Sequence, residues 1–171
     1  MTQWKMLTLV GSDQPGIVAQ ITHVVYHQGW ALGETSMLRL GGNFTIMMMV
    51  AGAESNEALE KVMQPVAYRL HLHLHIDEIS GGLHQHALPN YQVRVMGSDR
   101  VGIVAQVTGI LAEADFNILE LTSDVAGSAD EPVYIMTIQG HSVSELESIE
   151  KALSTLDDVD VSVKPIEILF G

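Results

Sequence analysis

The chain contains no cysteine among its 171 residues. This absence excludes disulfide bonds, thiolate-ligated metal centres and cysteine nucleophiles. It says nothing about the compartment, because a chain without cysteine is compatible with any redox environment. The length suits one or two small domains.

Cations are also scarce. Eight Lys and Arg residues stand against 21 Asp and Glu, which gives a formal net charge of −13 and an isoelectric point near 4.8. Nucleic-acid binding draws most of its affinity from neutralising phosphates with Lys and Arg. Because the eight cations are scattered and form no cluster, we expect no direct binding to DNA or RNA and none to anionic membranes.

Long apolar runs are missing as well. No uninterrupted stretch approaches the ~18 residues that span a bilayer, and residues 1–10 lack the basic start, apolar run and cleavage site of a signal peptide. Hydrophobic residues nevertheless make up 47% of the chain, which is enough for a buried core. We therefore expect a soluble cytoplasmic protein without a membrane segment.

What the chain does contain is an internal duplication. GSDQPGIVAQIT (11–22) recurs as GSDRVGIVAQVT (97–108), with nine of twelve positions identical at an offset of 86. An extended apolar stretch precedes each copy, at 5–10 and 91–96. After each, apolar residues recur at the i, i+1, i+4, i+7 and i+8 spacing of an amphipathic helix.

Both copies continue with the same predicted elements. The strands expected after the first helix are 34–40 and 44–50 in the first copy, and 118–125 and 133–139 in the second. A second amphipathic helix and a last strand, 71–79 or 159–169, complete each copy. The order β-α-β-β-α-β predicts an α+β fold of two tandem ferredoxin-like domains, each a four-stranded antiparallel sheet with two helices on one face.

Glycine and proline mark the boundary between the copies. SGGLHQHALPN (80–90) contains both residue types and predicts a linker. We therefore expect a first domain at 1–80, a linker at 81–90 and a second domain at 91–171.

The best-duplicated segment lies where the first strand turns into the first helix. We predict that the carboxylates of Asp13 and Asp99 cap the helices, and that Pro15 occupies a first turn where no N–H is needed. The glycines permit tight backbone paths. A helix N-terminus with free N–H groups also attracts carboxylates, so the residues alone leave two interpretations open: a turn with a cap, or a ligand site.

These segments resemble the ACT domain. The resemblance rests on a strand, then Asp-x-Pro-Gly-Ile-Val (13–18) opening a helix, then Gly-Trp-Ala-Leu (29–32) or Phe-Asn-Ile-Leu-Glu (116–120) leading into a strand. ACT domains are small regulatory modules that bind amino acids. Two such copies with almost nothing else resemble the glycine cleavage system transcriptional repressor family, and the resemblance covers essentially the whole chain.

The resemblance implies a ligand site at the duplicated loop, often where two domains meet, with the carboxylate and amine of the ligand held by the backbone. The residues that it places at the ligand are Gly11, Ser12, Asp13, Gln14, Pro15, Gly16 and Ile17 in the first copy, and Gly97, Ser98, Asp99, Arg100, Val101, Gly102, Ile103 and Asn117 in the second.

Each copy departs from the common family form, which has Arg and then Pro before the second glycine. The first copy reads Gln14-Pro15 and the second reads Arg100-Val101. The Asn that often follows the first helix is present as Asn117, but its counterpart is Ala31. We therefore expect two unequal sites, with the second better suited to polar ligand contacts.

Five of the eight histidines fall between residues 71 and 86. In LHLHLHID (70–77), His73 and His75 share one side of a predicted strand, and this is the pair that could bind a metal ion. The aligned residues of the second copy are Asp160 and Ser162, which need no imidazole. We therefore predict a strand with histidines on its solvent face, and neither a metal site nor a cofactor.

A second histidine pair lies on the first predicted helix. His23 and His27 are four residues apart, a spacing that can chelate a metal ion. The second copy has Gly109 and Glu113 at these places, so we interpret the pair as surface histidines.

Signatures of catalysis are missing. Ser12 and Ser98 lie in the duplicated loops, but no histidine occupies an equivalent place in both copies, as a nucleophile with its base would require. Most acidic residues belong to solvated helix faces. We predict no catalytic site.

The leading hypothesis is a non-catalytic regulatory protein that binds a small amino acid, with glycine as the first candidate. Because the chain is acidic, it would act by contacting a DNA-binding transcription regulator and not DNA itself. The alternatives are a histidine-ligated metal sensor and a structural module that assembles without a ligand. Homo-oligomers are expected in all three cases.

Overall fold

The computed structural model describes residues 3–79, 87–98, 100–128 and 132–167. The chain divides into two compact units, Met1–Gln85 and His86–Gly171, and the division falls inside the segment predicted as a linker. Each unit is described by itself. Within the described residues, no helix is long and apolar enough to cross a membrane.

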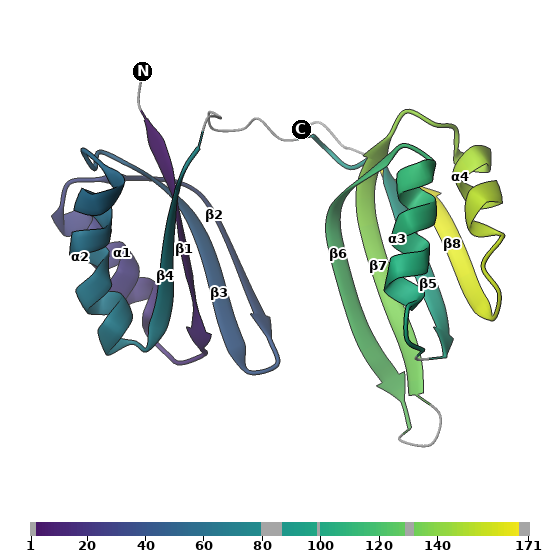
Figure 1. The fold of residues 1–171 in the computed structure, drawn as a ribbon, viewed down its shortest axis with the longest axis horizontal. Coiled ribbons are helices and arrows are strands. Elements are labelled where there is room, and N and C mark those ends of the chain that lie inside the picture. The colour runs from purple at the N-terminus through teal and green to yellow at the C-terminus, as the bar shows by residue number, and fades with distance from the viewer. Residues whose placement is uncertain (1–2, 80–86, 99, 129–131, 168–171) are drawn as a thin grey trace. The chain divides into compact units, whose positions relative to one another are not determined.

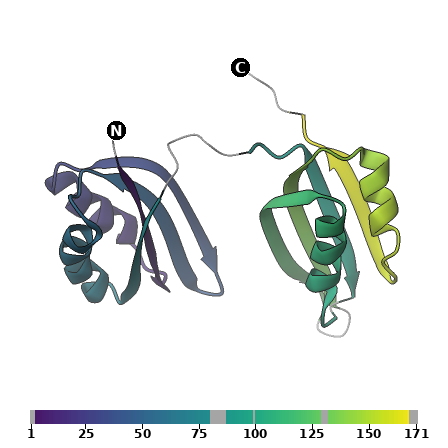
Figure 2. The ribbon, with the colours of Figure 1, turned by 45° about the horizontal axis from the view of Figure 1, so that its top comes forward.

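The first domain has the predicted β-α-β-β-α-β order. Its elements are β1 (Trp4–Ser12), α1 (Ile17–His27), β2 (Ala31–Leu40), β3 (Asn43–Ala51), α2 (Asn56–Arg69) and β4 (Leu72–Glu78). The strands form one antiparallel sheet in the order β2-β3-β1-β4. Both helices lie on the same side of this sheet (Figures 1 and 2).

The second domain repeats this arrangement. Its elements are β5 (Tyr91–Ser98), α3 (Ile103–Glu113), β6 (Phe116–Gly127), β7 (Pro132–Ser142), α4 (Leu146–Leu153) and β8 (Val159–Pro165). The antiparallel order is β6-β7-β5-β8, which matches the first sheet strand for strand. The predicted fold of two tandem ferredoxin-like domains is therefore confirmed.

Two strand starts were predicted too late. β2 begins at residue 31 where 34 was predicted, and β6 begins at residue 116 where 118 was predicted. In both copies the pairing register shifts shortly after the true start, between Leu32 and Thr35 and between Ile118 and Glu120. Such a bulge interrupts the two-residue alternation of side chains, so the first residues of β2 and β6 do not continue the pattern of the rest of the strand.

The predicted end of the last strand is also corrected. β8 stops at Pro165, short of the predicted residue 169, and residues 166 and 167 belong to no strand. Residues 168 and 169 lie outside the described part of the chain. A proline cannot donate to the ladder, so it commonly marks a strand boundary.

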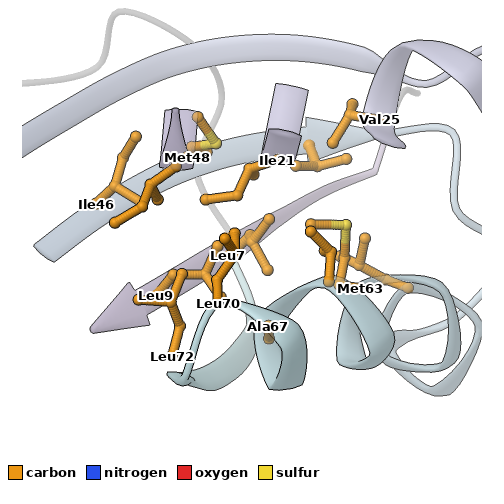
Figure 3. Close-up of a cluster of buried hydrophobic side chains, with 14 of the residues drawn as sticks. Leu7, Leu9, Ile21, Val25, Ile46, Met48, Met63, Ala67, Leu70 and Leu72 are labelled. Atoms are coloured by element: carbon orange, nitrogen blue, oxygen red, sulfur yellow. The ribbon is translucent and has the colours of Figure 1, made fainter. Parts of the chain in front are cut away.

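Alternation along the central strands determines which face is buried. In β1 the side chains of Leu7 and Leu9 point to the helices and are fully buried, whereas Val10 faces the other side and is exposed. Figure 3 shows Leu7 and Leu9 in one buried cluster with Ile21 of α1 and Met63 of α2. Each such side chain contributes roughly 1.5–3 kcal/mol when it leaves water.

The second core uses equivalent positions. Val93 and Val95 of β5 pack under Val107 and Leu111 of α3, and Ile149 of α4 closes the layer. The same spacing of apolar residues thus produces the same layer twice. Each domain consequently has a complete core of its own.

One buried group is unexpected. Lys5 lies on the helix side of β1 with only 2% of its surface exposed, and its ammonium group donates a hydrogen bond to the carbonyl oxygen of Ala53 at 3.0 Å. The corresponding residue of the second domain, Tyr91, donates its hydroxyl to the carbonyl oxygen of Ser144 at 3.2 Å. In both domains a long polar side chain therefore fastens the first strand to the segment that leads into the second helix.

The contribution of the Lys5–Ala53 hydrogen bond to the stability of the first domain can be measured by substitution. We expect Lys5→Ala to lower the free energy of unfolding of the first domain by about 2–4 kcal/mol, because it leaves a cavity and an unpaired buried carbonyl. Lys5→Met, which preserves the packing, should cost clearly less. Both tryptophans, Trp4 and Trp30, belong to the first domain, so tryptophan fluorescence during denaturation reports this domain alone.

The matched control is Lys61→Ala. Lys61 is exposed on α2, and such surface substitutions usually change stability by less than about 0.5 kcal/mol. Equal costs for Lys5→Ala and Lys61→Ala would contradict a structural role for the buried amine.

Candidate ligand-binding loops

The two duplicated loops connect the first strand of each domain to its first helix. Both helices begin directly after a glycine in the left-handed conformation, Gly16 with φ 86° and Gly102 with φ 92°. Neither helix N-terminus has a side-chain cap within the described residues. Among the described residues no side chain caps the first N–H groups of α1 and α3, although at α3 the N–H of Ile103 donates to the carbonyl oxygen of Arg100 at 3.4 Å.

The predicted carboxylate cap is wrong for the first loop. The carboxylate of Asp13 instead forms an ion pair with Arg39 of β2, and its backbone N–H donates to the carbonyl oxygen of Gly42 at 3.1 Å. A turn at residues 15 and 16 precedes the helix, which begins only at Ile17, so Asp13 is not at the N-cap position. Asp99, the predicted cap of the second loop, lies outside the described residues.

Pro15 is also placed differently. It precedes the N-cap residue Gly16 and lies outside the helix, not in its first turn as predicted. Its fully exposed counterpart Val101 occupies the same position before Gly102. Both residues border the open helix N-terminus.

A contrasting helix shows what a capped start looks like. Ser55 precedes α2, and its hydroxyl accepts a hydrogen bond from the N–H of Ala58 at 3.1 Å. A hydrogen bond from the same side chain, together with one from its own backbone, lowers the pKa of Glu57. At the N-terminus of α2 a side chain of the protein accepts a hydrogen bond from a backbone N–H group, whereas no side chain of the described residues does so at the N-terminus of α1.

The other two glycines of the loops are required by packing. A Cβ on Gly11 would lie 2.8 Å from the carbonyl oxygen of His71 and 2.7 Å from the side chain of Leu72. A Cβ on Gly97 would lie 2.9 Å from the carbonyl oxygen of Asp158 and 2.8 Å from the side chain of Val159. These glycines bring the end of the first strand against the turn that starts the last strand.

Gly16 and Gly102 have a different role. A Cβ on Gly102 would have nothing within 4 Å, and one on Gly16 would meet only the side-chain nitrogen of Gln20 at 3.8 Å. Glycine is needed here because of the positive φ, and the approach to the helix N-terminus is open.

A side-chain clasp joins each loop to the turn before the last strand. In the first domain, Nε2 of Gln14 donates to the carbonyl oxygen of Leu70 at 2.9 Å. In the second, a terminal nitrogen of Arg100 donates to the carbonyl oxygen of Asp157 at 3.3 Å. Gln14, which departs from the family form, and Arg100, which keeps it, thus make the same contact, but only Arg100 brings a charge.

A hollow of about 290 Å³ borders the second clasp. Its walls are Arg100, Gln106, Ile110, Thr155, Leu156 and Asp157. The Nε atom of Arg100 is buried and has no hydrogen-bond partner among the described residues. In the first domain, Arg69 replaces Leu156 and donates to the side-chain oxygen of Gln20, the counterpart of Gln106, at 3.3 Å.

Not every predicted residue offers its side chain to this region. Ile17 and Ile103 are almost fully buried in the two cores, so only their backbone faces the loops. Ser12 and Ser98 end their strands with exposed side chains.

Asn117 is not brought to the second loop. It lies at the start of β6 opposite His141 of β7, whereas Gly97 lies opposite Tyr134 of the same strand. The distance along β7 from Tyr134 to His141 is about 24 Å at 3.4 Å per residue. Within one domain, Asn117 and the loop cannot contact the same small ligand.

A larger hollow of about 490 Å³ lies elsewhere in the first domain. It is lined by residues that include Gln28, Trp30, Gly52 and Lys61. Gln28 and Trp30 follow α1, so this hollow borders the end of the helix opposite the duplicated loop. The pattern of the sequence contained no signal for it.

The histidine strand shows no assembled metal centre. His75 Nε2 lies 3.1 Å from an oxygen of Asp77, and both side chains are exposed. Among the described residues, no group of three or more His, Cys, Asp and Glu side chains is arranged to hold a metal ion.

Comparison with known proteins identifies the family. Residues 6–77 and residues 91–159 each match the ACT domain. The chain belongs to the ACT domain family. Members of this family are regulatory modules that bind amino acids.

Individual relatives agree with the assignment. The UPF0237 protein of Clostridium perfringens is 31% identical over 81 residues, which cover 46% of this chain and 91% of the relative. A protein of unknown function from Galdieria sulphuraria has the same fold over 98% of this chain and 100% of its own, with a TM-score of 0.80 and 22% identity. A protein described as a candidate glycine cleavage system transcriptional repressor matches over 98% and 99%, with a TM-score of 0.71 and 24% identity.

The glycine positions of the ACT loops provide a stability test. We expect Gly11→Ala and Gly97→Ala each to destabilise their own domain by about 1–3 kcal/mol, because the added Cβ overlaps a backbone carbonyl oxygen. Gly11→Ala should shift the tryptophan fluorescence transition, whereas Gly97→Ala should shift only the part of the circular dichroism transition that fluorescence does not follow.

Gly109→Ala is the matched control. Gly109 lies within α3, and a Cβ there would have nothing within 4 Å. We expect it to leave stability unchanged or to raise it by up to about 1 kcal/mol, because alanine is the better helix former. A destabilisation equal to that of Gly97→Ala would refute the packing role of Gly97.

Proposed function

We propose that this protein is a non-catalytic cytoplasmic regulator that binds a small amino acid at its duplicated loops. The observation that carries the proposal is the open, uncapped helix N-terminus behind a left-handed glycine, present in both domains. Such an end attracts a carboxylate through its free N–H groups and the helix dipole. An amino-acid carboxylate would replace the missing cap.

The second loop is the better candidate. It carries Arg100, the one cation in the two loops, next to a hollow of about 290 Å³. Its buried Nε donor lacks a partner among the described residues, and a carboxylate oxygen would satisfy it. In the first domain the neutral Gln14 occupies this position, and Arg69 donates a hydrogen bond to Gln20 beside it.

Glycine is the first candidate ligand. The candidate glycine cleavage system transcriptional repressor, which shares this fold over nearly the whole chain, supports the choice. Glycine is also the smallest amino acid, and the space beside Gly102 at the helix N-terminus is open.

Regulation would proceed through another protein. A chain with a net charge of −13 and scattered cations is unsuited to binding phosphates, so a DNA-binding transcription regulator is the proposed partner. The amino acid controls this contact only if its affinities for the free and the bound chain differ.

The position of Asn117 supports a homo-oligomer. Because this residue lies about 24 Å from the loop along the sheet, it can contact a ligand there only if another ACT domain supplies it. Association of domains would therefore complete the site.

The decisive experiment exchanges the two clasp residues. Thermal unfolding is followed against the twenty amino acids, with glycine expected to give the largest rise in the midpoint. A ligand at 100 times its dissociation constant adds about 2.7 kcal/mol, or several degrees for a chain of this size. Arg100→Gln should then weaken binding roughly 10- to 100-fold, the value of a hydrogen bond to a charged group.

The substitution isolates the charge because glutamine makes the same clasp in the first domain. The reciprocal Gln14→Arg should strengthen binding at the first loop. If no amino acid raises either midpoint, the loops are packing elements and the protein is a structural module. If binding occurs but Arg100→Gln leaves it unchanged, the guanidinium does not contact the ligand.

A second measurement tests the route of regulation. In an electrophoretic mobility assay at about 50 mM salt, where nonspecific binding is strongest, we expect the chain alone to leave a DNA fragment unshifted. A shift that weakens steeply with added salt would show direct phosphate binding and would overturn the proposed protein-mediated mechanism.

A further inference from the structure

Two histidines of the first domain face each other on α1. His23 and His27 lie one turn apart on the exposed side of the helix, and their Nε2 atoms are 3.0 Å apart. The ring centroids are separated by 4.2 Å at an interplanar angle of 78°. The two Nε2 atoms thus form a hydrogen-bonded pair on the exposed face of the helix, and a metal ion that replaces the shared proton would find both nitrogens within its reach.

We propose that His23 and His27 form a bidentate surface site for a late first-row divalent transition metal ion, copper(II) or nickel(II) ahead of zinc. Neutral imidazole nitrogen is a ligand for these ions at a distance of about 2.0–2.1 Å. Water completes the coordination, because no third His, Asp or Glu joins a metal-binding group within the described residues.

The nitrogen separation is compatible with the coordination geometry of these ions. Two nitrogens 3.0 Å apart, each about 2.05 Å from a shared ion, subtend an angle of roughly 94°. This is close to the 90° between neighbouring ligands in octahedral and square-planar complexes, which nickel(II) and copper(II) adopt. A tetrahedral zinc ion would require the nitrogens to separate to about 3.3 Å.

The electrostatic surroundings favour a cation. His27 is the last residue of α1, where the negative end of the helix dipole attracts positive charge. α1 contains no Lys or Arg, and the whole chain carries a net charge of −13. The guanidinium of Arg69 lies one turn earlier, where it donates to Gln20.

The histidine-rich strand lacks this arrangement. Alternate residues of a strand are about 7 Å apart, so His73 and His75 on β4 are not held at a common point by their backbone. His75 Nε2 is directed to Asp77. The histidine pair on α1 is therefore a better candidate for metal binding than the histidines of β4.

Nickel(II) titration calorimetry on the full chain tests the site. We expect His23→Gln and His27→Gln each to weaken nickel binding at least about tenfold, because one ligand no longer brings the second to the ion. Both side chains are exposed, so the fold should be unaffected. The double variant His73→Gln/His75→Gln should bind this ion as the native chain does.

A composition-matched variant tests the spacing. His27→Gln combined with Gln28→His keeps the number of histidines but separates them by five residues, so it should bind as weakly as His27→Gln. Addition of copper(II) should broaden amide NMR signals of α1 in the native chain and leave them sharp in His27→Gln. Unchanged nickel affinity in both single variants, or loss of binding in the β4 double variant, would overturn the proposal.

Discussion

The close approach of the first strand to the turn before the last strand is the constraint on which each domain depends. Gly11 lies against the backbone of His71 and Leu72, and Gly97 lies against Asp158 and Val159. His71 and Asp158 both have positive φ, 54° and 60°, so the turn has the same unusual path twice. This contact places the clasp residue within reach of a carbonyl oxygen and positions the first helix. The path of the candidate ligand loop thus depends on the packing of Gly11 and Gly97 against the start of the last strand.

The two domains share this constraint but differ in charge beside it. Gln14 and Arg100 donate to equivalent carbonyl oxygens, yet only Arg100 brings a cation, and its buried Nε donor has no partner among the described residues. In the first domain Arg69 donates to Gln20, whereas in the second Leu156 replaces this arginine and lines a hollow. The two domains therefore share the same fold, but the side chains beside the candidate ligand loop differ between them. The His23–His27 pair is a further property of the first domain alone.

Most of the fold was predictable because its signals are local and occur twice. Alternation at Leu7 and Leu9 and the helical spacing that begins at Ile17 identify buried faces without reference to the rest of the chain. Features that depend on pairing or conformation were missed. The bulges in β2 and β6 interrupt the side-chain alternation near the start of each strand. At the first loop, α1 begins only after the left-handed Gly16, and Asp13 pairs with Arg39 instead of capping the helix.

The sequence by itself determined the duplication, the order of elements, the acidic surface and the family, since each is written in residue types and their spacing. Only the tertiary structure decided what the conspicuous residues do. It placed Asn117 at the far end of the sheet from the loop, and it buried Lys5. It also brought the Nε2 atoms of His23 and His27 to 3.0 Å while directing His75 at Asp77. The physical reason is that spacing along a chain defines a face, whereas distances between side-chain atoms depend on packing, rotamers and strand register.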